Sequence, residues 1–216
     1  MSRSSIAPWC LGGLLSLGLL ACPDTPPHTQ AQTGVRSAAV QPKATSTGPV
    51  NDKSGFCELT FPAAGSKARP LVWPAMRPLP GESAAVAPPV KRGNWIWVNL
   101  WATWCEPCLA EMSLLGRWTK GLRAGGNDLD LELLTIDAPE NATTLQGRIE
   151  AGLPGTVRWV RDEPAFGAFL DGLGVDRTAA IPIHALVDPG GQVRCVRVGA
   201  ISALDFAAVK GIITGR

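Results

Sequence analysis

The chain has 216 residues, of which 45% are apolar and 18% are charged. This length and apolar content are sufficient for one domain with a proper core, with further sequence at its ends. The formal net charge of +2 is too small to favour nucleic acid or an acidic membrane surface as the main partner.

The N-terminal residues have the pattern of an export signal. Arg3 and the free amine give a positive start, and an apolar run extends from Ile6 to Ala21. The run is too short for a comfortable membrane span and suits a secretory signal. Ala21-Cys22 resembles a lipoprotein signal-peptidase site, so we expect residues 1–21 to be removed and Cys22 to carry lipid. The alternatives are an ordinary cleaved signal or an uncleaved anchor, with Cys22 incidental.

Each of these alternatives exports the protein to a compartment where disulfides persist. The expected location is the periplasmic face of a bacterial membrane. Residues 22–55 are rich in Pro, Thr, Ser, Ala and Gln and contain hardly any large apolar residue. Such a segment cannot bury enough surface to offset its ordering entropy, which predicts a disordered tether. The folded domain is then expected over residues 56–216.

Apolar periodicity in this domain predicts strands that alternate with helices. Strands are predicted over residues 56–61, 71–73, 94–101, 129–136, 157–160, 183–187 and 192–198. Helices are predicted from Pro107 to the Gly125-Gly126 pair, and over residues 139–151, 164–173 and 202–213, the last capped by Ser202. The sequence Asp188-Pro189-Gly190-Gly191 is typical of a hairpin turn. This order predicts an α/β three-layer sandwich, in which helices flank a mixed central sheet behind an N-terminal strand extension. The Pro-rich stretch 62–93 has no clear assignment.

The motif Cys105-Glu106-Pro107-Cys108 follows a buried strand and opens a helix. Such a pair is half of a zinc site, a structural staple or a redox pair. Zinc usually needs four ligands; no second Cys pair exists and the two histidines lie far apart in the sequence, so no metal is expected. At a helix N-terminus the dipole and the free N–H groups favour the thiolate of Cys105. Cys108 lies one turn further, where it can close an internal disulfide.

Two residues between the cysteines affect this chemistry. Pro107 suits the first helical turn, where a backbone donor would go unused. Glu106 adds negative charge beside the thiols, which opposes thiolate formation and weakly favours a reducing role.

The segment from Asn99 to Cys108 resembles the active-site segment of the TlpA/ResA/DsbE-like branch of the thioredoxin superfamily. The resemblance extends over residues 56–216 in the order of strands and helices. It implies a thioredoxin-like fold whose redox group is the Cys105–Cys108 disulfide, with no other cofactor. Thioredoxins proper carry a buried Asp at the position of Asn99, which cannot act as a base. A Glu of the TlpA/ResA-like branch is similar in place to Glu111. The implied role is to move the proton of Cys108, and the alternative is a solvent-facing helix residue.

The resemblance also implies a role for Ile181-Pro182. In thioredoxin-like proteins a cis-Pro loop faces the cysteine pair, and the residue before the proline pairs through its main chain with the substrate peptide. Pro182 directly precedes an apolar strand, which is the matching place; a trans proline at a strand start is the alternative. Ile181 is therefore a candidate substrate contact, together with Trp104, Glu106 and Pro107.

Two other polar residues lie on or beside predicted strands. His184 is in the strand after Pro182 and is expected to be structural. Asp137 ends the strand at 129–136, near the sheet edge where sites collect. The preferred interpretation of Asp137 is an N-cap for the helix that starts at Pro139.

The chain has six cysteines. Cys10 leaves with the signal, Cys22 is the lipidation site, and the Cys-x-x-Cys motif takes two more. Cys57 and Cys195 are left over, each in a predicted strand of an exported protein. We expect them to form a structural disulfide, the alternative being two separate buried thiols.

The main hypothesis is a membrane-tethered dithiol reductase that acts on disulfides of exported proteins. The family resemblance implies targets such as apocytochrome c or copper-centre assembly proteins, with electrons from a membrane thiol donor. A monomer without nucleic-acid partners is expected. One alternative is an oxidase or isomerase of the same fold, because the sequence does not set the direction of electron flow. A peroxiredoxin would want Thr-x-x-Cys, and Thr103 lies only two residues before Cys105. A non-catalytic Cu(I) metallochaperone usually adds a His or a wider Cys spacing.

Overall fold

A computed structural model describes residues 54–85, 87 and 93–215 of the chain. The expected signal peptide at residues 1–21, the lipidation site Cys22 and nearly all of the tether at 22–55 lie outside the described residues. No helix within the described ranges is long and apolar enough to cross a membrane.

The centre of the domain is a sheet of seven strands in the order β1-β7-β6-β3-β4-β5-β2. Neighbours β3, β4 and β5 are parallel to one another, and every other pairing is antiparallel. The sheet is therefore mixed, as the sequence predicts. The strands are β1 (Leu59–Thr60), β2 (Met76–Arg77), β3 (Trp95–Trp101), β4 (Leu129–Thr135), β5 (Thr156–Val160), β6 (Ile183–Val187) and β7 (Val193–Val198).

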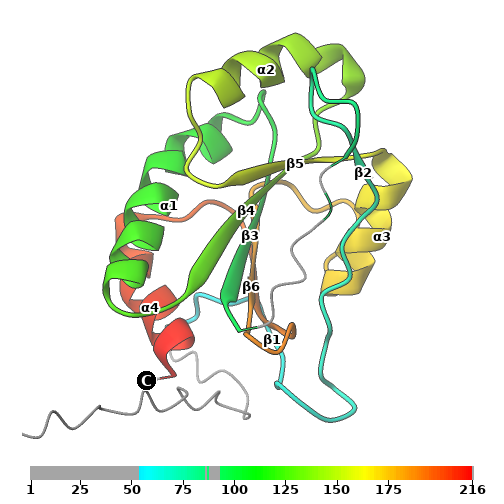
Figure 1. The fold of residues 1–216 in the computed structure, drawn as a ribbon. Helices are drawn as coiled ribbons and strands as arrows, with labels where there is room; N and C mark the ends of the chain where they lie inside the picture. The colour runs from blue at the N-terminus through cyan, green and yellow to red at the C-terminus, as the bar shows by residue number, and fades with distance from the viewer. Residues whose placement is uncertain (1–53, 86, 88–92, 216) are drawn as a thin grey trace, which may run out of the picture. The chain divides into compact units, whose positions relative to one another are not determined.

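Helices cover both faces of this sheet, with α1 and α4 on one side and α3 on the other (Figure 1). Side chains of β3 alternate between the two faces because the strand period is two. Trp97 and Trp101 pack in the core under α1, whereas Val98 and Leu100 pack in the core under α3. The three-layer α/β sandwich predicted from the sequence is confirmed. The helices are α1 (Glu106–Ala124), α2 (Ala142–Glu150), α3 (Glu163–Leu173) and α4 (Phe206–Thr214), with short 3₁₀ turns η1 (Pro139–Asn141) and η2 (Ala203–Asp205).

Helix α1 begins and ends where the sequence signals predict. Cys105 is its N-cap residue and a proline lies in its first turn. One stripe of the helix is buried against the sheet, including Leu115, Trp118 and Leu122. At the C-terminal end the N–H of Gly125 bonds to the carbonyl oxygen of Gly121 at 3.0 Å.

The Pro-rich stretch connects the two edges of the sheet. Strand β1 pairs with β7 at one edge and β2 pairs with β5 at the other. Between them Phe61, Leu71 and Trp73 pack against the α3-side core. The predicted strand at 56–61 is too long and the one at 71–73 is misplaced. Among the described residues before β3, only Leu59–Thr60 and Met76–Arg77 form ladders. Prolines in this stretch have no N–H to donate, which restricts it to short edge strands.

Two predicted helices begin with a tighter turn than expected. The helix predicted at 139–151 is η1 followed by α2, and the one predicted at 202–213 is η2 followed by α4. Ser202 does act as a cap, in a capping box with Asp205 at the start of η2. Short 3₁₀ turns of this kind are frequent at helix N-termini.

A disulfide joins Cys57 to Cys195, with a Cα–Cα distance of 5.4 Å. Cys195 is buried in the α1-side core, and Cys57 precedes β1. The bond attaches the start of the N-terminal extension to β7. The sequence allowed either a disulfide between Cys57 and Cys195 or two separate buried thiols, and the structure has the disulfide.

Candidate active site

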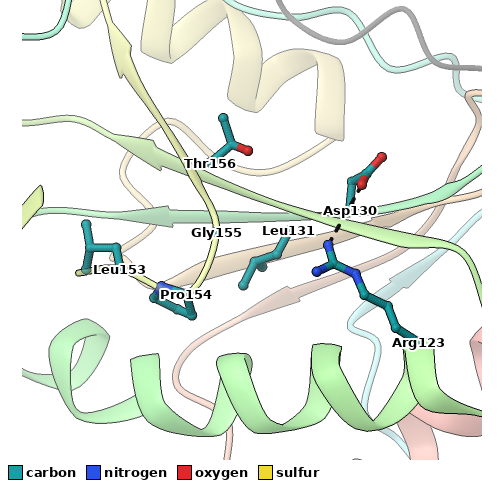
Figure 2. A pocket seen from close by; sticks show the side chains of 7 residues that line it. All are labelled: Arg123, Asp130, Leu131, Leu153, Pro154, Gly155 and Thr156. Atoms are coloured by element: carbon teal, nitrogen blue, oxygen red, sulfur yellow. Dashed lines mark ion pairs between the residues drawn. The ribbon is translucent and has the colours of Figure 1, made fainter.

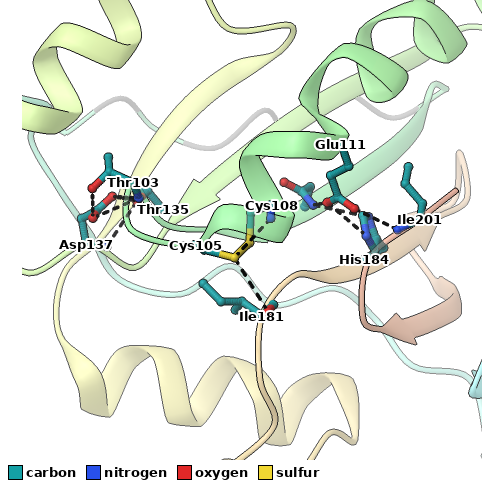
Figure 3. The surroundings of a disulfide bond; sticks show 10 residues. Thr103, Cys105, Cys108, Glu111, Thr135, Asp137, Ile181, His184 and Ile201 are labelled. Atoms are coloured by element: carbon teal, nitrogen blue, oxygen red, sulfur yellow. Dashed lines mark hydrogen bonds and ion pairs between the residues drawn. A yellow bond between two sulfur atoms is a disulfide. The ribbon is translucent and has the colours of Figure 1, made fainter.

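The Cys105–Cys108 disulfide lies at the N-terminus of α1 (Figure 3). The Sγ of Cys105 accepts a hydrogen bond from the main-chain N–H of Cys108 at 3.3 Å. Cys108 is fully buried, and Cys105 keeps 5% of its surface exposed. A helix N-terminus stabilises negative charge on a sulfur placed there. The geometry therefore favours Cys105 as the sulfur that carries a thiolate after reduction.

The loop before β6 faces this disulfide. The Ile181–Pro182 peptide bond is cis. The carbonyl oxygen of Ile181 lies 3.8 Å from Cys105 Sγ, and Figure 3 draws this contact as a dashed line. The N–H of Gly199 bonds to the carbonyl oxygen of Pro182 at 2.8 Å. The end of β7 thus holds the loop in place against Cys105.

The surface beside Cys105 is formed by the other residues of the motif. The side chain of Trp104 is 62% exposed, although it is large and apolar. Glu106 and Pro107 are also exposed. The candidate substrate contacts Trp104, Glu106 and Pro107 are therefore exposed beside Cys105, and Ile181 lies opposite it.

Glu111 is buried rather than solvent-facing, with 2% of its surface exposed. Asn99 donates its amide to Oε1 at 2.9 Å, and the main-chain N–H of Ile201 donates to Oε2 at 2.9 Å. These two donors compensate for the desolvation of the carboxylate. Glu111 follows Cys108 by one turn of α1, so the two side chains lie on neighbouring parts of the same helix face.

His184 lies next to this carboxylate and is 1% exposed. Its Nδ1 accepts a hydrogen bond from Trp97 Nε1 at 3.2 Å, and its Nε2 lies 3.4 Å from Glu111 Oε1. The sequence predicted a structural residue here. The structure shows in addition that His184 borders the glutamate beside the cysteine pair.

Asp137 is not a helix cap, so the interpretation preferred from the sequence is wrong. The cap residue of η1 is Ala138, without a side-chain hydrogen bond. The buried carboxylate of Asp137 instead accepts the N–H of Thr103 at 3.0 Å and its hydroxyl at 2.6 Å, together with the hydroxyl of Thr135. It therefore fixes the turn that leads into Cys105. Thr103 and Asp137 are separated by 34 residues, so no local pattern signals the contact.

Two carboxylates with lowered pKa values lie at the two ends of α3, away from the cysteines. The guanidinium of Arg161 and then the N–H of Ala165 donate to Asp162 and lower its pKa below the ordinary 3.8. The Arg177 guanidinium likewise lowers the pKa of Asp171. These groups stabilise the start and the end of α3 and take no part in the site.

A separate hollow of about 250 Å³ lies at the other end of α1 (Figure 2). An ion pair between Arg123 and Asp130, 3.8 Å apart, forms part of its lining. The remaining lining comes from β4 and from the segment that enters β5, and none of the lining residues is a Cys or a His. Among the residues that the structure describes, no cluster of three or more His, Cys, Asp or Glu could hold a metal ion.

Comparison with known proteins gives both sequence and structural relatives. No protein-family model matches the chain. The thiol-disulfide oxidoreductase ResA of Geobacillus kaustophilus is 25% identical over 152 residues, which are 70% of this chain and 78% of that protein. A DsbF homologue from Corynebacterium diphtheriae has a TM-score of 0.52 at 18% identity, over 74% of this chain and 96% of that one. A thiol:disulfide interchange protein from Chlorobium tepidum has a TM-score of 0.51 at 22% identity, over 69% and 99%.

The fold and the cysteine pair at the N-terminus of α1 define a thioredoxin-like redox enzyme, a thiol–disulfide oxidoreductase. Its redox group is the disulfide of its own two cysteines. Within that superfamily the chain is similar to ResA, and its active-site segment resembles that of the TlpA/ResA-like branch.

Proposed function

We propose that this protein is an exported dithiol reductase of protein disulfides. The observation that carries the proposal is the asymmetric burial of the two cysteines at the cis-Pro loop. Cys105 is the partly accessible sulfur, 3.8 Å from the carbonyl oxygen of Ile181, whereas Cys108 is fully buried. A substrate sulfur has access to Cys105 alone, which suits an attacking and a resolving cysteine.

The reaction has two steps. The Cys105 thiolate attacks one sulfur of a substrate disulfide; a Cys105–substrate bond forms and the other substrate sulfur leaves as a thiolate. Cys108 then loses its proton and attacks Cys105, which forms the internal disulfide and expels the second substrate thiolate. The substrate thiolates take up two protons. Two electrons pass from the dithiol to the substrate, and a thiol donor of the membrane restores the dithiol.

The remaining site residues have supporting roles in this proposal. Glu111 takes the proton of Cys108, because it is the buried carboxylate one helical turn away. The main chain of Ile181, before the cis Pro182, pairs with the substrate peptide. Trp104 supplies exposed apolar surface to that peptide, with Glu106 and Pro107 at its edge.

The sequence pattern supports the proposed location. Residues 1–21 would be removed, Cys22 would carry lipid, and residues 22–55 would tether the catalytic domain, residues 56–216, to a bacterial membrane on its periplasmic side. Exported proteins with disulfides, such as apocytochrome c or copper-centre assembly proteins, are the substrates that the family resemblance favours. The enzyme would act as a monomer.

The test is a trapping experiment with the full chain. Cys108→Ala removes the resolving sulfur, so mixed disulfides with exported proteins accumulate on Cys105 and disappear when a reductant is added. The double variant Cys105→Ala/Cys108→Ala is the matched control and traps nothing. If Cys108→Ala traps no more than this control, the mechanism is wrong.

A redox titration of the Cys105–Cys108 couple tests the direction. A potential of about −270 mV, as in thioredoxin, supports a reductase, and one of about −120 mV would make the protein an oxidase.

Metabolic labelling with a radioactive fatty acid tests the lipid anchor. The unmodified chain should take up the label, and Cys22→Ala should abolish it.

A further inference from the structure

The buried imidazole of His184 has a defined protonation pattern. An indole N–H only donates hydrogen bonds, and Trp97 Nε1 donates to Nδ1 of His184 at 3.2 Å. The side-chain amide of Asn99 also approaches this nitrogen, at 3.4 Å. Nδ1 must therefore carry a lone pair. The proton of the neutral ring is then on Nε2, because in a doubly protonated ring both nitrogens are donors.

This Nε2–H faces the glutamate beside the cysteine pair. Nε2 lies 3.4 Å from Glu111 Oε1, and this separation does not meet hydrogen-bond geometry in the disulfide state. Within the described residues Nε2 has no hydrogen-bond partner, although His184 is 99% buried. A buried donor without a partner costs free energy. Its presence in a native structure therefore calls for an explanation, and a role in another state of the protein supplies one.

The groups that surround His184 and Glu111 leave the Glu111 carboxylate as the natural partner of the His184 Nε2–H. From β3 come the neutral side chains of Trp97 and Asn99, and from the segment after β7 the main-chain N–H of Ile201. Arg197 is the register neighbour of His184 on β7, but its guanidinium donates to the carbonyl oxygens of Phe56 and Ala200. From α1 come Cys108 and Glu111 themselves.

We propose that His184 is a positioning residue for the second step of the reaction. As a neutral ring held by Trp97, it directs its Nε2–H at Oε1 and is the third donor that orients the Glu111 carboxylate. Glu111 takes the proton of Cys108, Cys108 attacks Cys105, and the substrate thiolate leaves; His184 neither gains nor loses a proton. This inference rests on the proposed reductase function, and it assigns to His184 a role in one step only.

Nitrogen NMR of the full-length, ¹⁵N-labelled protein tests the tautomer. The chain has two histidines, His28 and His184, so His28→Gln leaves a single imidazole to observe. The expected result at neutral pH is a protonated Nε2 and an unprotonated Nδ1, both before and after reduction. A protonated Nδ1, alone or together with Nε2, overturns the inference. This measurement does not depend on any substrate.

Stopped-flow kinetics with an unfolded protein disulfide tests the role in catalysis. His184→Phe keeps a ring of similar size but has no donor, and we expect substrate release from the mixed disulfide to slow about tenfold, the effect of one charge-assisted hydrogen bond. The slowing should be confined to this step, because only the attack of Cys108 needs Glu111 to be held in place. Formation of the mixed disulfide should be unchanged.

His184→Gln is the matched variant, because its amide oxygen can accept from Trp97 while its N–H donates to Glu111. It should recover most of the rate of substrate release. Equal slowing of both steps, or no slowing in His184→Phe, contradicts the proposal. If His184→Phe does not fold, the NMR result decides. If the unmodified protein forms no mixed disulfide, the reductase function fails, whereas the tautomer is still measured independently.

Discussion

Removal of the Asp137 carboxylate should loosen the turn that presents Cys105. In the variant Asp137→Ala, the main-chain N–H and hydroxyl of Thr103 and the hydroxyl of Thr135 all lose their acceptor. The hydroxyls can rotate toward other partners. The N–H of Thr103 cannot, and Thr103 is only 7% exposed.

The expected cost follows from these contacts. A buried N–H left without a partner costs about 1–3 kcal/mol, and each hydrogen bond to a charged group contributes about 1.5–3 kcal/mol. Since the hydroxyls recover part of their loss, we expect the free energy of unfolding to fall by about 3–5 kcal/mol, at the upper end for a single substitution.

Urea denaturation of the oxidised protein measures this loss, with Asp162→Ala as the matched control. Asp162 is half-buried, accepts one main-chain N–H, from Ala165 at 2.9 Å, as the N-cap of α3, and accepts a second N–H from the exposed guanidinium of Arg161. Loss of such a cap costs about 1 kcal/mol. Alkylation of Cys105 in the reduced protein should also change rate in Asp137→Ala but not in the control. If both variants lose the same free energy and alkylate alike, Asp137 does not hold the turn.

Three further outcomes follow from contacts outside the site. Replacement of both Cys57 and Cys195 by Ala opens a link between residues 138 apart and should lower the free energy of unfolding by up to about 5 kcal/mol in urea, while the redox potential of the active pair is unchanged. In the unmodified protein Arg158 lies 2.7 Å from the buried carboxylate of Glu132. Glu132→Gln removes this counter-charge and should lower the free energy of unfolding by about 3–5 kcal/mol in the same assay. The neighbouring arginine is the first cause of the lowered pKa of Asp162. The ionised Asp162 therefore stabilises the fold above pH 3.8, its ordinary pKa, and this stabilisation is lost as the pH falls through the lower pKa of the folded state. The free energy of unfolding of Asp162→Asn should depend less steeply on pH in this acid range.

The local features of this protein were accessible from its sequence. An apolar strand followed by Cys105, with a proline in the next turn, is enough to place a thiol at a helix N-terminus, because caps and first turns depend on neighbouring residues. The same holds for the end of α1 at Gly125 and for the Ser202 cap. Along most of the sheet the strand bounds also agree with the periodicity to within one or two residues.

Where prolines interrupted the periodicity, local patterns were insufficient. Residues 56–61 and 71–73 have the composition of strands, yet a ladder forms only where a partner edge is available, and that edge is far away in the chain. Pairing of β2 with β5 therefore depended on the whole sheet. Strand propensity is context-dependent for this reason.

The sequence alone determined the reacting pair and the element on which it lies. Only the tertiary structure decided what surrounds that pair, because these contacts join residues distant in the chain. Asp137 contacts Thr103 because the two residues follow the ends of the neighbouring parallel strands β4 and β3. Glu111 lies next to His184, which is on β6 where that strand pairs with β3. Burial then changed the meaning of these polar residues: a carboxylate that a local pattern assigns to a cap or to solvent becomes, inside the fold, a fixed acceptor beside the cysteines.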